Sequence, residues 1–253
     1  MLPEVWLKGG KNMKILYAAS EAQPVAASGG LADVAGSLPK ALVEEGHEAC
    51  VVVPLYVNTI KQQWRDQMTY ITNFSVPVGW RNQYCGLFTA KINNVTYYFL
   101  DNEYYFKRDF GLYGYYDDAE RYAFFSRAVL EMLRVIDFKP QIINSNDWQC
   151  ALIPVYYSIF YRNDEKLWGI KNVFTIHNIQ YQGRYGMEIL EDVLGIPKHF
   201  ASLMEYDRDI NLMKAAIEVS DKVTTVSPTY SKEILDPWFS HGLDRALSDK
   251  QYK

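Results

Sequence analysis

The feature that most constrains the fold is a strand–loop–helix–strand unit near the start of the chain. A short apolar run, Met13–Ala19, is typical of a strand that is buried on both faces of a parallel sheet. A loop containing Gly29 and Gly30 follows, and apolar residues at helical spacing then occupy residues 31–42. A second apolar run, Glu48–Tyr56, completes the unit. The pattern predicts two parallel strands joined by a helical crossover.

The crossover helix is expected to bury one face. Apolar residues recur three, seven, ten and eleven positions after the first of them, and these residues are Leu31, Val34, Leu38, Ala41 and Leu42. Pro39 lies inside the pattern and is expected to kink the helix without ending it, because the apolar stripe continues beyond it. Gly46 is placed to cap the C-terminus of the helix.

Between Thr69 and Asp101 the apolar pattern changes to period two. Two alternating runs flank Asn93 and Asn94, whose side chains tolerate the left-handed conformation that a two-residue hairpin loop requires. The pattern predicts an antiparallel hairpin. We expect it at a partly solvated edge of the main sheet; a separate binding module is the alternative.

After the hairpin, α/β alternation resumes and continues almost to the end of the chain. The predicted elements are a helix over about 119–136, a strand over 141–147, a helix over 148–161, a strand over 171–178, helices within 188–219, a strand over 221–227 and a helix from Pro228. This alternation predicts an α/β fold: a doubly wound, mostly parallel, Rossmann-like sheet with an antiparallel hairpin.

Composition excludes several function classes. The formal net charge is −4, which does not favour nucleic acid or an anionic membrane as partner, and no run of apolar residues is long enough to span a bilayer. The three cysteines are far apart and form no metal-binding motif, so neither disulfides nor a metal are expected, and a cytoplasmic location is predicted. Residues 1–12 are interpreted as an upstream extension or a cloning remnant, and 13–253 as one domain.

Ligands of open α/β sheets bind beyond the carboxyl ends of the strands, so the residues that follow each strand are the candidates for a site. Gly29 and Gly30 precede a helix, where backbone N–H groups can approach an anion such as a phosphate; an ordinary turn is the alternative. Asp33, in the first helical turn, can simply complement the helix dipole. The chain contains neither GxxxxGK[ST] nor a GxGxxG after a strand, which disfavours P-loop and NAD-binding functions.

Two later strands also end in polar residues. Asp147 follows the strand over 141–147 and either faces the ligand or caps the next helix. His177 and Asn178 end a strand, and the histidine either points into the cleft or is a structural residue bonded to backbone. Asp117 and Asp118 are best interpreted as the charged start of a helix. Aromatic residues, at 15%, include clusters at 104–106 and 113–116 that suit sugar contacts, although many rings must serve the core.

Several segments together, in order, resemble the N-terminal half of bacterial glycogen synthases and plant starch synthases. The resemblance covers Met13 to about Leu247 and rests on MKILYAASEAQPVAASGGLADVAGSLPKAL, DDAERYAFFSRAVLE, NSNDWQCALIPV, VFTIHNIQYQG, NLMKAAIEVSDKVTTVSPTYSKEI and GLD. It implies the N-terminal, acceptor-side domain of a glycosyltransferase-B fold. The implied activity is transfer of glucose from ADP-glucose to the non-reducing end of an α-1,4-glucan, with retention of configuration and without a cofactor or bound metal. It also implies a partner, the enzyme's own C-terminal nucleotide-binding domain, which we expect to lie outside this chain.

The resemblance also implies roles for individual residues. Gly29 and Gly30 would lie against the diphosphate, with Ser28 and Asp33 in the same motif. The histidine of the motif, His177, would contact the transferred glucose, and Asn178 follows it. Asp147 would line the glucose and acceptor region. On this interpretation His177 and Asp147 are the catalytic-site residues, and the chain alone is expected to turn over negligibly.

Two positions depart from the family pattern, and two other functions stay open. A lysine is usual where this chain has Ala27, so less positive charge faces the diphosphate; a glycine is usual at Arg245. The first alternative function is a noncatalytic glucan-binding module. The second is another sugar-nucleotide glucosyltransferase that uses UDP-glucose, since one architecture hosts many activities.

Overall fold

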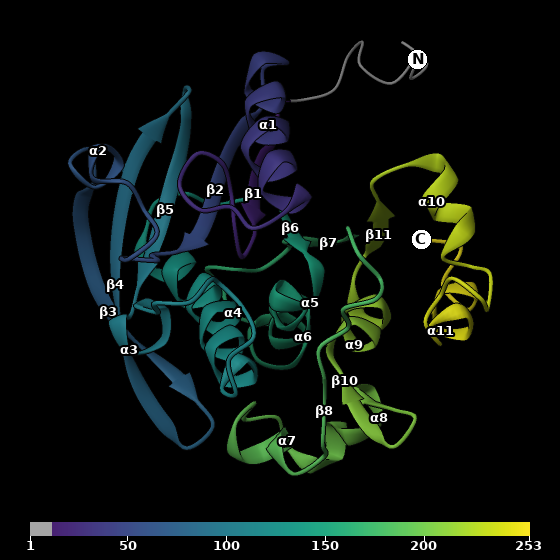
Figure 1. Cartoon of the computed structure of the whole chain (residues 1–253). Coiled ribbons are helices and arrows are strands. Elements are labelled where there is room, and N and C mark those ends of the chain that lie inside the picture. Colours follow the sequence, from purple (N-terminus) through teal and green to yellow (C-terminus); the bar gives the residue numbers. More distant parts are fainter. Residues whose placement is uncertain (1–11) are drawn as a thin grey trace.

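A computed structural model describes residues 12–253, and its central element is an eight-stranded sheet (Figure 1). The strands are β1 (Lys14–Ala18), β2 (Glu48–Pro54), β3 (Thr69–Val78), β4 (Arg81–Ile92), β5 (Val95–Asp101), β6 (Ile142–Asn146), β7 (Lys171–Ile176) and β11 (Lys222–Thr225). Their order across the sheet is β11-β7-β6-β1-β2-β5-β4-β3. All neighbours from β11 to β5 pair in parallel, and β5-β4-β3 pair antiparallel. The predicted fold class is confirmed.

Eleven α-helices flank the strands in the described part of the chain. They are α1 (Gly30–Glu44), α2 (Gln62–Arg65), α3 (Glu103–Phe106), α4 (Asp118–Val135), α5 (Asp147–Cys150), α6 (Leu152–Tyr156), α7 (Ile189–Asp192), α8 (Ala201–Met204), α9 (Leu212–Val219), α10 (Pro228–Glu233) and α11 (Asp244–Ser248). Eleven of the twelve residues interpreted as an extension, 1–11, lie outside the described residues. No helix of the described residues is long and apolar enough to cross a membrane.

The two faces of the sheet bury separate cores. Residues of β1 alternate between them: Tyr17 packs on the side of α1, and Leu16 and Ala18 pack on the side of α4, α6 and α9. The core on the side of α4, α6 and α9 is the larger of the two. In Figure 1 these three helices lie together on one side of the sheet. Coverage on both faces explains why the central strands are continuous apolar runs rather than alternating ones.

Helix α1 extends as predicted, but its buried face is not the predicted one. It continues through Pro39 and ends before Gly46, whose φ of +91° fits the left-handed residue after a helix. The buried side chains are Leu31, Ala32, Ala35 and Pro39, whereas Leu38 is 40% exposed. The close packing of small residues against the sheet rotates the helix away from the stripe of larger ones.

The antiparallel hairpin forms one edge of the main sheet, as predicted. Ile92 pairs with Val95, and Asn93 and Asn94 have φ values of 50° and 66° in the loop between them. Strand β3 extends this edge by pairing with β4.

The segment from 148 to 219 is less regular than predicted. The helix expected over 148–161 is broken into α5, α6 and a π-helical turn, Tyr157–Tyr161. A second sheet also forms, from β8 (Arg184–Tyr185) in the segment before the predicted helices and from β9 (Glu205–Tyr206) and β10 (Asp209–Asn211) within 188–219, where only helices were expected. These strands are two or three residues long, too short for a period-two pattern to predict.

Candidate active site

A large cavity lies where the strand order reverses. Strand β1 is followed along the chain by β2 on one side, whereas β6 and β7 lie on its other side. Residues at the carboxyl ends of β1, β6, β7 and β11 line a cavity of about 900 Å³, called here the switch-point cavity. Six of the seven predicted site residues line it: Ser28, Gly29, Gly30, Asp147, His177 and Asn178. The seventh, Asp33, is exposed in the first turn of α1 and is not among the lining residues.

The glycine loop leaves the start of α1 open to a ligand. Gly29 is the N-cap, and no described side chain caps the helix there. Neither Gly29 nor Gly30 has a positive φ, and a Cβ on Gly30 would meet no described atom within 4 Å. A strained turn therefore does not explain the glycine pair, which instead leaves space for close approach of a ligand to the backbone N–H groups.

Glu21, which the sequence argument did not identify, shares the glycine loop. It is 3% exposed, lines the cavity, and its Oε2 accepts a hydrogen bond from the backbone N–H of Ser28. Burial raises the pKa of the Glu21 carboxyl, against the opposing effect of hydrogen bonds from Ser28 and Gly29. The Glu21 carboxylate thus accepts a hydrogen bond from one backbone N–H group of the glycine loop, the loop that the sequence predicts to face a phosphate.

Asp147 combines backbone strain with a buried charge. It is the first residue of α5, and its φ of 55° lies in the left-handed region, which is rare outside glycine. Its Oδ1 accepts hydrogen bonds from the backbone N–H groups of His177 at 2.7 Å and Asn178 at 3.2 Å. Burial nevertheless raises its pKa from 3.8 to about 6. Oδ2 accepts no hydrogen bond from residues 12–253, so it can accept one from a sugar hydroxyl.

The hydrogen bonds of Asn146 fix the His177 ring. The Nδ2 of Asn146 donates to the carbonyl oxygens of Ala18 and Asn144, so its Oδ1 is the acceptor that faces His177 Nε2 at 2.9 Å. Nε2 therefore carries the proton, a tautomer assigned from this network. Burial lowers the pKa of His177 from 6.5 to about 4, which keeps the ring neutral at pH 7. Nδ1 is then left as an acceptor that bonds no described residue.

Another part of the cavity lining lies at the start of α4 and just before it. Asp118, the first residue of α4, accepts hydrogen bonds from the backbone N–H groups of Gly114 and Tyr115 and pairs with the fully buried Arg121. This confirms the interpretation of Asp118 as the charged start of a helix, and it also orders the Tyr113–Gly114 segment, which lines the cavity.

The two aromatic clusters considered for sugar contacts, 104–106 and 113–116, differ in the structure. In the first cluster, Tyr105 and Phe106 are buried in the core, so sugar contact by those two rings is ruled out, and only Tyr104 is exposed. In the second, Tyr113 lines the switch-point cavity, where its hydroxyl lies 2.7 Å from Ser20 Oγ.

The fold and the cavity together define a class of protein. An uncapped helix start, a neutral imidazole and a carboxylate meet at the carboxyl edge of a parallel sheet, an arrangement that can hold a ligand with both anionic and hydroxyl groups. Among residues 12–253 no cluster of three or more His, Cys, Asp or Glu side chains is placed to hold a metal ion.

Comparison with known protein families identifies the family to which the chain belongs. A family model described as the starch synthase catalytic domain matches residues 14–249, and the chain belongs to this family. Over 242 residues the chain is 47% identical to a glycogen synthase of Exiguobacterium sibiricum, a match covering 94% of this chain and 50% of the relative. A glycogen synthase of Clostridium botulinum is 47% identical over 243 residues, covering 95% and 50%. The chain therefore spans about half the length of these relatives.

A solved structure supports the fold assignment. The catalytic domain of starch synthase IV from Arabidopsis thaliana, bound to ADP and acarbose, superposes with a TM-score of 0.86 at 28% identity. The match covers 96% of this chain and 50% of that one. The resemblance stated from the sequence is thus confirmed at the level of family and fold.

Proposed function

We propose that this chain forms the acceptor-side domain, residues 13–253, of a glycogen synthase that transfers glucose from ADP-glucose to the non-reducing end of an α-1,4-glucan with retention of configuration. One observation carries the proposal: in a member of the starch synthase family, the glycine loop, Asp147 and His177 line a single cavity. Similarity to glycogen synthases at 46–47% identity supports the reaction.

The geometry suits glucosyl transfer. In this reaction the bond between the anomeric carbon and the diphosphate breaks, a bond to the acceptor hydroxyl forms, and the hydroxyl proton is released. Positive charge develops at the anomeric carbon, where the free Oδ2 of Asp147 can stabilise it. The Nδ1 of neutral His177 can accept a hydrogen bond from a glucose hydroxyl. Backbone N–H groups at the start of α1 can donate to the departing diphosphate.

We further propose that a second, nucleotide-binding domain supplies most of the grip on the diphosphate. Ala27, the position where the family usually has lysine, is exposed at the glycine loop, and Glu21 brings a carboxyl group to the same place. Little positive charge therefore faces the phosphates from this side. The chain 1–253 should fold alone yet elongate glucan negligibly, and robust elongation by it would refute this division of roles. The buried thiols of Cys50, Cys85 and Cys150 suit a reducing compartment, and we propose the cytoplasm.

The test is glucan elongation by the full-length gene product with radiolabelled ADP-glucose and maltotetraose. Asp147→Asn and His177→Ala should each lower kcat/KM about a hundredfold or more, whereas His199→Ala, at an exposed position, should leave it unchanged. Elongation that survives both substitutions, together with maltotetraose binding by this chain alone, would instead favour a noncatalytic glucan-binding module. Competition between ADP-glucose and UDP-glucose in the same assay identifies the donor.

A further inference from the structure

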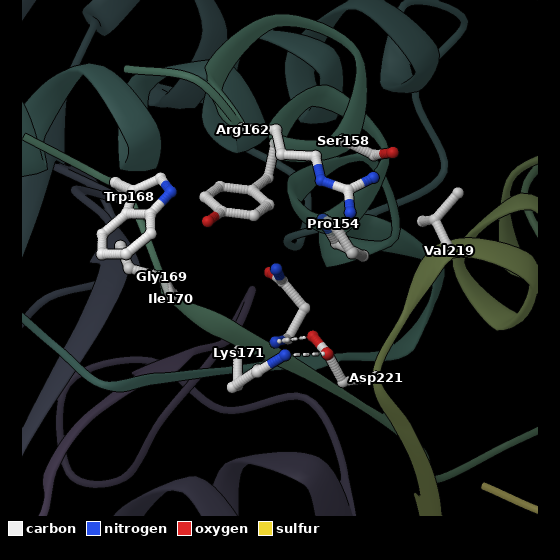
Figure 2. A pocket seen from close by; sticks show the side chains of 11 residues that line it. Pro154, Ser158, Arg162, Trp168, Gly169, Ile170, Lys171, Val219 and Asp221 are labelled. Carbon is white, nitrogen blue, oxygen red and sulfur yellow. Dashed lines mark hydrogen bonds and ion pairs between the residues drawn. The ribbon is translucent and has the colours of Figure 1, made fainter. Parts of the chain in front are cut away.

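A second pocket lies at the opposite end of the sheet from the switch-point cavity. It has a volume of about 300 Å³ and lies at the amino ends of β7 and β11, against the π-helical turn that follows α6 (Figure 2). Asn172, at the start of β7, lines this pocket, and His177 comes five residues later at the other end of the strand. At ~3.3 Å per residue the two sites are roughly 16 Å apart along the strand. They share no lining residue.

The floor of the second pocket is polar. The Asp221 carboxylate accepts hydrogen bonds from the Lys171 ammonium at 2.8 Å and from the backbone N–H of Asn172 at 2.9 Å, and Figure 2 shows both. Asn172 is 3% exposed, yet its side-chain Oδ1 accepts no hydrogen bond from the described part of the chain. That oxygen is inaccessible from the pocket, whereas the side chain of Asp221 is 37% exposed, so its carboxylate can accept a further hydrogen bond from a hydroxyl group that enters the pocket.

The rim carries an exposed aromatic ring and a cation. The indole of Trp168 is 78% exposed at one side of the pocket. In Figure 2 the Arg162 guanidinium extends over the pocket from the side opposite Lys171 and Asp221, and within residues 12–253 it forms no ion pair. Tyr157 lines the wall, and its hydroxyl donates to the Leu167 carbonyl oxygen, which fixes the ring.

This set of groups matches a sugar better than an anion. A pyranose ring has an apolar face that stacks on an indole and hydroxyl groups that both donate and accept hydrogen bonds. Arg162 and Lys171 can donate to such hydroxyls, and the Asp221 carboxylate can accept from one. A phosphate has no apolar face to stack on Trp168, and the Asp221 carboxylate would repel it.

We propose that this pocket is a second carbohydrate site, which binds one glucosyl unit of an α-glucan chain by stacking on Trp168. The identity of the glucan rests on the proposed function; the sugar chemistry rests on the pocket itself. Because the pocket lies at the far end of β7, a unit bound here belongs to a part of a branched glucan remote from the reacting end. Such an anchor raises the effective concentration of chain ends at the switch-point cavity.

The test is a titration of the ¹⁵N-labelled chain with maltotetraose, followed by amide and indole NMR shifts. The Trp168 indole N–H and the Gly169 amide should shift together and saturate. Trp168→Ala should raise the dissociation constant at this site about tenfold, whereas Trp238→Ala, at an equally exposed indole elsewhere, should leave it unchanged.

The other outcomes separate this inference from the proposed function. Shifts confined to Gly29, His177 and Asn178 would overturn the second site and leave the proposed function intact. Shifts near Trp168 with inorganic phosphate but not with maltotetraose would overturn the sugar assignment. Saturation near Trp168 with no elongation by the full-length product would leave the second site standing without the proposed function.

Discussion

Replacing Asp147 by asparagine should stabilise the protein at neutral pH while removing activity. Burial raises the pKa of Asp147 to about 6 from 3.8, although the N–H groups of His177 and Asn178 act in the other direction. The folded state therefore binds this proton more tightly than the unfolded state does. The stability that Asp147 contributes is fully present below about pH 4 and is lost as the pH rises through about 6.

The magnitude follows from this pKa difference. About two units correspond to about 3 kcal/mol of unfolding free energy at pH 7.5, and to about half of that at pH 5. Asparagine keeps an oxygen that can accept the same two N–H groups, and it tolerates the positive φ of this position. The substitution thus removes the charge and little else, and we expect a gain of about 1 to 3 kcal/mol at pH 7.5.

Urea denaturation of the chain at pH 7.5 and pH 5.0 measures this gain. Asp221→Asn is the control of opposite sign: burial acts to raise the pKa of Asp221, but hydrogen bonds from Lys171 and Asn172 outweigh it and lower the pKa. That variant should be less stable than the wild type at pH 7.5. A less stable Asp147→Asn variant, or a gain that stays the same at both pH values, would refute the reasoning.

Three further expectations concern the same cavity. Because burial lowers the pKa of His177 to about 4, its ring should titrate near pH 4 by NMR, and its own contribution to stability should fall as the pH drops from 6.5 towards 4, opposite in sign to that of Asp147; a midpoint near 6.5 would contradict this. Ala27→Lys in the full-length product should tighten ADP-glucose binding about tenfold by calorimetry, and unchanged or weaker affinity would count against it. Gly30→Ala should leave Tm unchanged but weaken ADP-glucose binding about tenfold. Gly183→Ala should instead lower Tm, because Gly183 has a φ of 66° and an added Cβ would lie 2.8 Å from the Trp148 ring.

The order of strands and helices was predictable because local patterns and the final packing agree. The apolar runs at β1 and β2 are buried on both faces, and the two asparagines of the β4–β5 loop adopt the conformation that their side chains tolerate. Where packing overrides the local pattern, the prediction was wrong. In α1 the smaller side chains of Ala32 and Ala35 are buried against the sheet, and Leu38 of the predicted apolar stripe is exposed.

The site could be predicted at positions that directly follow strands and at the glycine loop that opens α1. Asp147 and His177 are such residues, and topology alone brings the ends of β6 and β7 together. Glu21 lies in a loop, and its approach to Ser28 depends on how that loop folds back, which no spacing in the sequence reveals. The same holds for the Asn146–His177 hydrogen bond, because it requires the register of two strands that are distant in sequence.

Several features that work against stability lie together at the carboxyl edge of the sheet. Asp147 is held at a positive φ with its carboxyl buried, Glu21 is buried with a raised pKa, and α1 begins without a side-chain cap from the described residues. Strands β1, β6 and β7 can hold them because each is paired on both sides within the sheet. Strained and buried charged groups are typical of functional sites, so the group of them around this cavity supports the proposal that it binds a ligand. Stabilisation by Asp147→Asn together with loss of elongation would directly measure the stability that this site gives up for activity.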